Sequence, residues 1–448
     1  MLTTKISGWG RYPVQSCELA RPERYADLGP HAESMIARGQ GRSYGDAALN
    51  ENGRVILTER VNRLIELDAA QGILRAEAGA TLAEILRVIV PKGWFLPVTP
   101  GTKFVSLGGC VAADVHGKNH HHEGSFGEHV VNLEIILAGG IRTRCSPTEH
   151  AELFWATVGG MGLTGIIGEV TLKLIPIQSP FIQVRHHVAE SLEQMFRLMQ
   201  DATTDDRYTV AWIDSMARGT RLGRGVVMCG HHASKDELPS HLHRHSKAES
   251  SLTIPFDFPS WMLNSLSISA FNALYYQKQG SKSKPFLSSY APYFYPLDSI
   301  GAWNRMYGKR GFVQYQCVIP DNNAFNGIKA LLQKLSDSRR PSFLAVLKRL
   351  GAASKGLLSF PMAGYTLALD LPIRDEGLFA LLNELDEIVL QHGGRVYLVK
   401  DARLSADSFR AMYPRYEEWL KIKNAVDPEN KFSSSLSRRL GIGDDTHE

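Results

Sequence analysis

The stretch ARGQGRSYGDAAL, residues 37–49, places three glycines around an arginine, a serine and a tyrosine. Two further glycine clusters follow, in PVTPGTKFVSLGGCVAADVHGKNHHHEGSFGEHV (residues 97–130) and WATVGGMGLTGII (residues 155–167). Glycine lets backbone N–H groups face a phosphate at short range. Three such loops in one region therefore predict a large polar ligand, and a dinucleotide fits this requirement. The alternative, that the glycines only form tight turns, suits one cluster better than three.

The two common nucleotide-binding motifs are absent. GGMGLTG, residues 159–165, superficially matches G-x-G-x-x-G, but no acidic residue ends a second strand about 20 residues further on, as a Rossmann fingerprint requires. No G-x-x-x-x-G-K-[ST] stretch occurs, which excludes a P-loop. We therefore expect the glycine-rich loops to belong to a different nucleotide-binding fold.

The composition is that of an ordinary globular protein. The 448 residues are too many for one compact core and predict two or more lobes. The formal net charge is +4, and no dense block of lysine or arginine suggests nucleic acid as a partner. Five scattered cysteines without C-x-x-C spacing indicate free thiols in a reducing compartment. Because no apolar signal segment is recognisable at the N-terminus, we expect a cytoplasmic protein.

Hydrophobic periodicity predicts an α+β first lobe. Apolar residues at i, i+3, i+4 and i+7 predict a helix over 82–89, with a capping box formed by Thr81 and Glu84. GEVTLKLIPI, residues 168–177, alternates apolar and polar side chains, which predicts a strand with one solvent-exposed face.

The segment after residue 310 predicts the core of the second lobe. Its elements follow in the order β-α-β-β-α-β, which is the split βαβ arrangement: an antiparallel four-stranded sheet with two helices on one face and the other face free for a ligand. The strands are expected at 311–320, 342–348, 365–373 and 395–400, and the helices at 323–335 and 377–394.

Strand parity indicates what the free face carries. Gln314 and Gln316 point to one side of their strand, and Thr366, Ala368 and Asp370 share one side of theirs. A sheet face that bears amides suits sugar hydroxyls. Plain exposure to solvent is the alternative that parity leaves open.

Several of these motifs resemble the flavin-binding lobe of the vanillyl-alcohol oxidase / p-cresol methylhydroxylase family. DVHGKNHH, WNRMYG, GFVQYQCVIP, GGRVYLVKDAR and MYPRYEEWLKIKNAVDPENKFSS are similar, more narrowly, to the decaprenylphosphoryl-β-D-ribose 2′-oxidase branch of it. The resemblance implies a two-lobed α+β fold of the p-cresol methylhydroxylase type. It also implies an FAD domain at residues 1–178, a substrate domain at 179–394, and a return to the FAD domain at 395–448.

The resemblance implies FAD as the cofactor. Arg42 stands where several sugar and alditol oxidases of the wider family have a histidine that bonds covalently to the flavin, so non-covalent FAD is expected. The residues that would contact FAD are Gly39, Gly41, Arg42, Ser43, Tyr44, Gly101, Thr102, Ser106, Gly108, Gly109, Ala113, His116, Gly117, Ile167 and Tyr397.

The resemblance also assigns the chemistry. Lys400 matches the catalytic lysine, which would accept the hydroxyl proton or hold the oxygen while hydride passes to flavin N5. Gln314, Gln316, Lys348, Tyr44 and His116 would position the sugar hydroxyls and the phosphate, with Lys348 expected on the phosphate. Ala368 replaces the cysteine of mycobacterial members, so thiol-directed ligands should not react here.

We expect no metal at the histidine run NHHHEG, residues 119–124, because adjacent histidines do not easily converge on one ion and the segment is not expected to be helical.

The function implied is oxidation of the 2′-hydroxyl of a polyprenylphosphoryl pentose to the 2′-keto form, the first half of an epimerisation for arabinose-type sugars of the cell envelope. A short-chain reductase would be the pathway partner, and a quinone or oxygen the electron acceptor. A soluble sugar, alditol or aldonolactone oxidase is the alternative enzyme, and a flavin-free sugar-phosphate receptor is the alternative outside enzymes.

Peripheral contact with the inner face of the cell membrane is a further expectation. The basic stretches 243–248 and 278–284, which we expect to be surface loops, flank Trp261, Phe271, Tyr275 and Tyr276. The uncharged run Phe258–Gln277 carries a proline and several Ser and Asn residues, which makes it a poor transmembrane helix. An ordinary buried helix with solvated loops is the alternative for this stretch.

Overall fold

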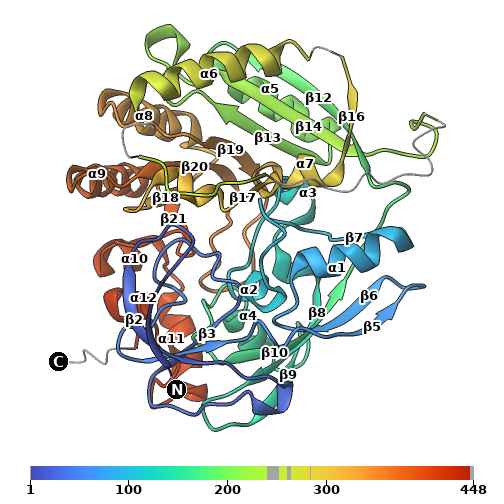
Figure 1. Cartoon of the computed structure of the whole chain (residues 1–448), viewed down its shortest axis with the longest axis vertical. Helices are drawn as coiled ribbons and strands as arrows, with labels where there is room; N and C mark the ends of the chain where they lie inside the picture. The colour runs from blue at the N-terminus through green and yellow to red at the C-terminus, as the bar shows by residue number, and fades with distance from the viewer. Residues whose placement is uncertain (1, 240–251, 260–263, 283, 444–448) are drawn as a thin grey trace.

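The computed structural model describes residues 2–239, 252–259, 264–282 and 284–443 of the chain. They form a mixed α and β molecule in which one large sheet occupies the upper half and two smaller sheets lie in the lower half (Figure 1). The expected α+β character is confirmed.

Two sheets build the lower half. The first has the order β1-β2-β4-β3, and the second, which is antiparallel throughout, has the order β5-β6-β10-β8-β9. Their strands are β1 (Leu2–Ser7), β2 (Val14–Ala20), β3 (Met35–Arg38), β4 (Arg54–Leu57), β5 (Leu64–Asp68), β6 (Ile73–Glu77), β8 (Val130–Ile136), β9 (Arg142–Cys145) and β10 (Ile166–Lys173). Short pairs join β7 (Trp94–Phe95) to β11 (Ile175–Pro176) and β15 (Leu252–Thr253) to β17 (Ile300–Gly301).

The upper sheet has eight antiparallel strands in the order β16-β12-β14-β13-β19-β20-β18-β21. Their bounds are β12 (Phe181–Ala189), β13 (Tyr208–Ile213), β14 (Gly225–His232), β16 (Phe286–Ser289), β18 (Phe312–Pro320), β19 (Ala345–Leu350), β20 (Gly364–Pro372) and β21 (Arg395–Val396). Together with α8 (Ala324–Asp337) and α9 (Gly377–Gln391), the last four strands follow the order β-α-β-β-α-β along the chain.

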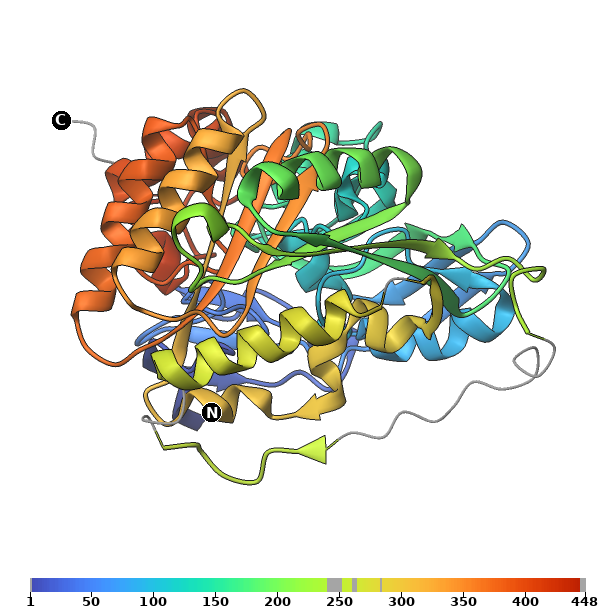
Figure 2. The same ribbon diagram turned by 90° about the horizontal axis from the view of Figure 1, so that it is seen from above.

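Helices cover both faces of the upper sheet. Helix α5 (Leu192–Asp205) lies on the face that α8 and α9 also cover, whereas α6 (Ser265–Gly280) lies on the opposite face, as Figure 2 shows. The other helices are α1 (Leu82–Ile89), α2 (Leu107–Ala112), α3 (His120–Glu123), α4 (Ala151–Thr157), α7 (Tyr290–Phe294), α10 (Ala406–Met412), α11 (Tyr416–Val426) and α12 (Ser435–Arg439). Helix α1 has the predicted bounds and the predicted capping box between Thr81 and Glu84.

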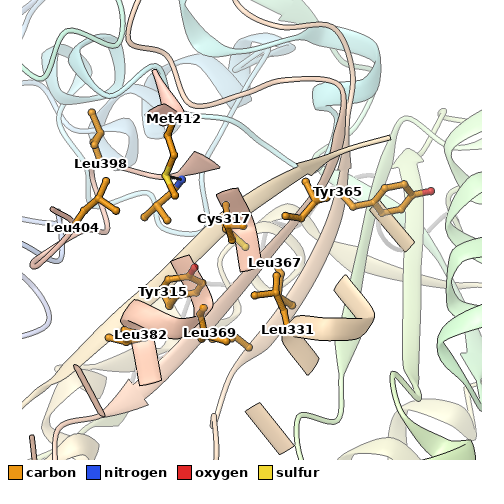
Figure 3. Close-up of a cluster of buried hydrophobic side chains, with 14 of the residues drawn as sticks. Tyr315, Cys317, Leu331, Tyr365, Leu367, Leu369, Leu382, Leu398, Leu404 and Met412 are labelled. Atoms are coloured by element: carbon orange, nitrogen blue, oxygen red, sulfur yellow. Dashed lines mark hydrogen bonds between the residues drawn. The ribbon is translucent and has the colours of Figure 1, made fainter. Parts of the chain in front are cut away.

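The upper sheet separates an apolar face from a polar one. Tyr315 and Cys317 of β18 point into a core with Leu367 and Leu369 of β20 and with leucines of α8 and α9 (Figure 3). The predicted parity is confirmed, because Gln314 and Gln316 donate to Asp370 and Thr366 on the other side. The sheet therefore presents amides toward the lower half of the molecule.

The C-terminal helices return to the lower half. Phe432 forms a parallel bridge with Met35 of β3, and Trp419 of α11 donates from Nε1 to the carbonyl of Ala156 at 2.9 Å. These contacts join the last part of the chain to segments about 260 to 400 residues earlier in the sequence.

Three local expectations are wrong. The last strand, expected over 395–400, ends at Val396 because the chain turns, and Lys400 donates its N–H to the carbonyl of Tyr397. The histidine run is partly helical, since α3 makes one turn over His120–Glu123. The basic stretch after Tyr275 is not entirely loop, because α6 continues to Gly280.

Two other observations concern the cysteines and the membrane. All five cysteines are free and buried. Within the described ranges, no helix has the length and apolar character needed to cross a membrane.

Candidate active site

One cavity lies between the polar face of the upper sheet and the glycine-rich loops below it. Every residue assigned above to FAD or substrate lines this cavity, except Gly117. A Cβ at Gly117 would lie 2.7 Å from the side-chain oxygen of Asn119 and 3.0 Å from the carbonyl of Thr99. Gly117 therefore has no room for a side chain beside the cavity, and its contact with FAD stays a prediction.

The loop after β3 offers backbone donors to the cavity. Within the described part of the chain, the N–H groups of residues 40–43 donate no hydrogen bond, although these residues line the cavity. Gly41 has a φ of 60°, a left-handed conformation that favours glycine. Successive free N–H groups around such a residue form a concavity that suits an anion such as a pyrophosphate.

The same loop is fixed against the segment that carries the predicted catalytic lysine. A Cβ at Gly45 would lie only 1.6 Å from the carbonyl oxygen of Asp401, so only glycine allows this approach. Tyr44 donates its N–H to the carbonyl of Val399 at 3.0 Å. The loop and Lys400 are therefore positioned relative to each other by main-chain contacts.

Arg42 lines the cavity beside two aromatic rings. Its guanidinium carbon is 3.9 Å from the ring centre of Trp9 and 5.5 Å from that of Phe104. Burial lowers the pKa of Arg42, and the nearby carboxylate of Asp298 partly offsets this. The stacked guanidinium remains a fixed cation beside the free N–H groups, since an arginine does not lose its proton at physiological pH.

His116 and Gln316 meet on the sheet face. The amide nitrogen of Gln316 lies 3.0 Å from Nε2 of His116 and 3.1 Å from Oγ1 of Thr366. Burial, followed by the charges of Lys348 and other neighbours, lowers the pKa of His116 well below its ordinary value. The ring is therefore neutral, and because Nε2 accepts from the amide, the proton lies on Nδ1. Among the described residues Nδ1 has no partner although it is buried, so it is a donor left for a ligand.

Two half-buried lysines face the cavity. Burial lowers the pKa of Lys348 to about 8. Burial also lowers the pKa of Lys400 to about 7, and the positive charge of Lys348 contributes, whereas Asp370 opposes the shift. The Lys400 nitrogen lies 4.0 Å from the ring centre of Tyr44. A desolvated lysine with a pKa near 7 exchanges a proton readily at physiological pH.

Asp370 is a functional candidate that was not assigned a role from the sequence. Its carboxylate accepts from the Gln314 amide at 2.5 Å and from the Tyr307 hydroxyl at 3.4 Å. Burial raises the pKa of Asp370 to about 6, against the opposing effects of Gln314, Lys400 and Tyr307. The parity of β20 placed Asp370 on the correct face and was the available signal.

Other side chains join the site from distant segments. Trp9, Asp298 and Trp303 line the cavity, and no role was assigned to them from the sequence. Lys118 is not among the lining residues; burial lowers its pKa to about 7, and its ammonium donates to the carbonyl of Tyr293. Only their placement in the fold reveals these residues.

The histidine run has structural contacts. The Nδ1 atom of His120 accepts the N–H of Gly351 at 2.9 Å. Across the described ranges, no group of three or more His, Cys, Asp or Glu side chains is arranged to hold a metal ion.

The residues of the cavity fit FAD. The free N–H groups of residues 40–43 and the Arg42 guanidinium suit the pyrophosphate. Gly101 leaves open space, because a Cβ there would meet no atom within 4 Å. At the position of Arg42 there is no nucleophile that bonds covalently to a flavin, since a guanidinium is always protonated.

Comparison with known proteins agrees with this geometry. A family model described as an FAD binding domain matches residues 28–146, and one described as D-arabinono-1,4-lactone oxidase matches residues 375–440. The chain is 38% identical over 455 residues to decaprenylphosphoryl-β-D-ribose oxidase of Mycolicibacterium smegmatis, covering 98% of each chain. It is 35% identical over 372 residues to an uncharacterised protein of Streptomyces coelicolor, covering 81% of this chain and all of that protein. It is also 29% identical over 164 residues to a putative D-arabinono-1,4-lactone oxidase of Neurospora crassa, covering 36% of this chain and 29% of that one.

Proposed function

The chain belongs to the family of decaprenylphosphoryl-β-D-ribose oxidase, and on that premise we propose that it oxidises the 2′-hydroxyl of a polyprenylphosphoryl pentose to the 2′-keto form with FAD as cofactor. One observation carries the proposal. The free backbone N–H groups of residues 40–43 open into the same cavity as the amides and lysines of the sheet face. A dinucleotide and a polar sugar phosphate can therefore meet in one desolvated space.

When bound, FAD supplies the acceptor for the two electrons that leave the substrate carbon. The amides of Gln314 and Gln316 orient the sugar hydroxyls, and Nδ1 of His116 donates to a ligand oxygen. The Lys348 ammonium binds the phosphate. Lys400 accepts the proton of the 2′-hydroxyl or holds its oxygen, as its pKa near 7 allows.

The FAD contacts follow the same geometry. We assign to FAD the residues named for it from the sequence, all of which except Gly117 line the cavity. Attachment is non-covalent because Arg42 replaces the linking histidine. Residues 1–178 and 395–448 would form the FAD domain of a p-cresol methylhydroxylase-type fold, and 179–394 the substrate domain with its split βαβ core. The bridge between Phe432 and Met35 supports this division, since it ties the last segment to the first.

The reaction needs partners that supply the second half of its chemistry. A 2′-keto product requires a reductase to complete an epimerisation, and the two electrons require a quinone or oxygen. A lipid-linked substrate requires access to a membrane, which supports peripheral association.

A lactone oxidase is the second candidate function, and the match over residues 375–440 favours it. That match does not include β18, β19 or β20, which carry the amides and Lys348. The match over residues 375–440 therefore gives little information about the sheet residues that would bind the substrate.

The position of the ketone in the product tests the proposed function. The holoprotein is incubated with a polyprenylphosphoryl ribose, and borodeuteride then traps any ketone. The proposal predicts deuterium at C2′ of both the ribo and the arabino epimers. Deuterium at another carbon, or none, contradicts it, and turnover of aldonolactones alone would support the second candidate.

A further inference from the structure

Helix α6 presents an apolar face to solvent. Leu266 is 83% exposed and Leu274 is 67% exposed, and the alanines at 270 and 273 between them are exposed as well. Positions 266, 270 and 274 share one side of a helix, so they form a continuous stripe. No Asp, Glu, Lys, Arg or His occurs from residue 264 to residue 277.

The opposite side of α6 is anchored, which fixes the stripe outward. The side-chain nitrogen of Asn272 donates to Oδ1 of Asp214 at 2.7 Å, and Ile268 is fully buried. The ring of Tyr275 packs 4.8 Å from that of Trp212 on β13. If α6 rotated about its axis to bury Leu266 and Leu274, these contacts would be lost.

This arrangement corrects part of the membrane surface expected from the sequence. Tyr275 and Tyr276 are half-buried and point toward the sheet, rather than outward. Trp261 and the basic stretch 243–248 lie outside the described residues. The exposed leucines replace the tyrosines as the apolar contacts.

The face of the sheet under α6 is continuous with the candidate active site. Gln316, Ala368, Val346 and Trp212 are successive cross-strand partners on β18, β20, β19 and β13. Direct partners point to the same face of a sheet, so the contact of Trp212 with α6 lies on the face that carries the cavity.

A second apolar path joins the exposed stripe to the cavity. The ring of Phe271, at the edge of the stripe, lies 4.9 Å from that of Phe343. Phe343 packs against the aromatic cluster that includes Trp303, and Trp303 lines the cavity. An apolar chain that extends from the cavity toward α6 thus meets apolar side chains along this path.

The charged side chains at the two ends of α6 are positive, whereas Asp214 and Glu190 lie beside Asn272 and Tyr276. The sequence has no acidic residue between Asp257 and Asp298, and three lysines follow the uncharged part of the helix at positions 278, 282 and 284. At the other end, the Ser265 hydroxyl donates to the carbonyl of Arg339, whose side chain is exposed. An exposed apolar stripe with cationic side chains at both ends can contact the acyl chains and the anionic headgroups of a membrane.

We propose that the exposed face of α6, defined by Leu266, Ala270, Ala273 and Leu274, docks on an anionic phospholipid bilayer. Docking brings the cavity to the headgroup level, so that the isoprenoid chain of the substrate stays in lipid while its sugar enters the cavity. The inference rests on the proposed function only for the identity of that lipid-linked substrate. Binding to the bilayer stands independently.

The test is flotation of the FAD-loaded full chain with vesicles of phosphatidylcholine alone or with about 30% phosphatidylglycerol, because basic residues are attracted to an anionic membrane surface. The proposal predicts binding to the anionic vesicles and at least about tenfold weaker partitioning of a Leu266→Glu/Leu274→Glu double variant. Ile141→Glu is the matched control, because Ile141 is 66% exposed in the turn between β8 and β9. It should partition as the wild type does.

Three results would overturn the proposal. The first is a wild-type protein that does not bind anionic vesicles, and the second is a double variant that floats with them equally well. The third result is a wild-type dimer in sedimentation velocity where the double variant is a monomer. The last would assign the face to a second copy of the chain. Oxidation of a water-soluble, short-chain substrate analogue should be unchanged in the double variant. If no lipid-linked sugar is oxidised while vesicle binding persists, the proposed function fails and the docking surface stands.

Discussion

A substitution at Gly101 should affect FAD binding without affecting the stability of the fold. A Cβ at Gly101 or at Gly139 would meet no atom of the chain within 4 Å, but only Gly101 lines the cavity. Gly101→Ala should therefore leave the stability of the FAD-free protein unchanged and weaken FAD binding about tenfold, because about 1.4 kcal/mol of steric conflict corresponds to that factor. Titration calorimetry with FAD and thermal unfolding of both variants check this. An equal FAD affinity in Gly101→Ala and Gly139→Ala would remove Gly101 from the FAD site.

Lys400 carries the proton chemistry of the proposed reaction. Lys400→Ala should slow anaerobic reduction of the bound flavin by about 10²–10⁴-fold, the usual contribution of a general base, while FAD stays bound. Stopped-flow absorbance measures the rate, and Lys421→Ala, at an exposed position on α11, is the control. A wild-type rate in Lys400→Ala would exclude the assigned role.

The role of Lys400 as a base predicts a pH profile. Its pKa lies near 7, so the neutral amine accumulates as the pH rises and the reduction rate should increase through that range to a plateau. The negative charge of Asp370 raises the pKa of Lys400, and Asp370 is mostly ionised above its own pKa of about 6. Asp370→Asn should therefore move the midpoint to lower pH. A midpoint that stays in place or moves upward would show that Asp370 does not act on Lys400, and Asp407→Asn, which is exposed, should leave it unchanged.

At the scale of elements, α12 holds the catalytic segment. Arg439 of α12 binds Asp46 at 2.8 Å and Asp401, the neighbour of Lys400, also at 2.8 Å. Both carboxylates are buried. Arg439→Ala leaves them without their cation, which should cost about 3–5 kcal/mol of the free energy of unfolding at pH 7. Arg415→Ala, which breaks an exposed pair with Glu418, should cost less than about 1 kcal/mol.

The free energy of unfolding that is lost in Arg439→Ala should depend on pH. Burial raises the pKa of Asp401, but Arg439 and Arg403 outweigh it and hold that pKa below its ordinary value. In the wild type this stabilisation is therefore present above the unfolded pKa of about 4 and is lost as the pH falls through the lower folded value. Without the arginine, burial raises the carboxylate pKa in the fold, and the destabilisation should shrink as the pH falls from 7 to 5. Urea unfolding at both pH values measures it. A loss that is the same at both values would mean that the carboxylates do not depend on Arg439.

The elements that the sequence predicted are those whose two faces differ in polarity. Helix α1 shows its amphipathic spacing directly, and β18 and β20 alternate between the amide face and the leucine core. Strand β13 (Tyr208–Ile213) is buried at every position, because α5 covers one face of the sheet and α6 packs beside Trp212 on the other. Such a strand has no period-2 signal, so its place in an eight-stranded sheet was not predictable from pattern alone.

At the scale of the whole molecule, the cavity combines segments that no local motif links. The glycine loops identified the cofactor-binding half, and strand parity identified the amide face. Trp9 and Trp303 reach the cavity from segments almost 300 residues apart, and only the packed structure brings them together. The apolar stripe of α6 was likewise hidden, because an uncharged run in a sequence does not reveal which of its side chains remain exposed.

The most direct test of the central claim is anaerobic bleaching of the visible absorbance of the bound flavin. A polyprenylphosphoryl ribose, free alditols and aldonolactones are added in parallel to the same holoprotein. The account predicts rapid bleaching by the lipid-linked ribose and none by the free sugars or lactones at equal concentration. Bleaching by polyols or lactones alone would contradict it, and would assign the cavity to a soluble sugar.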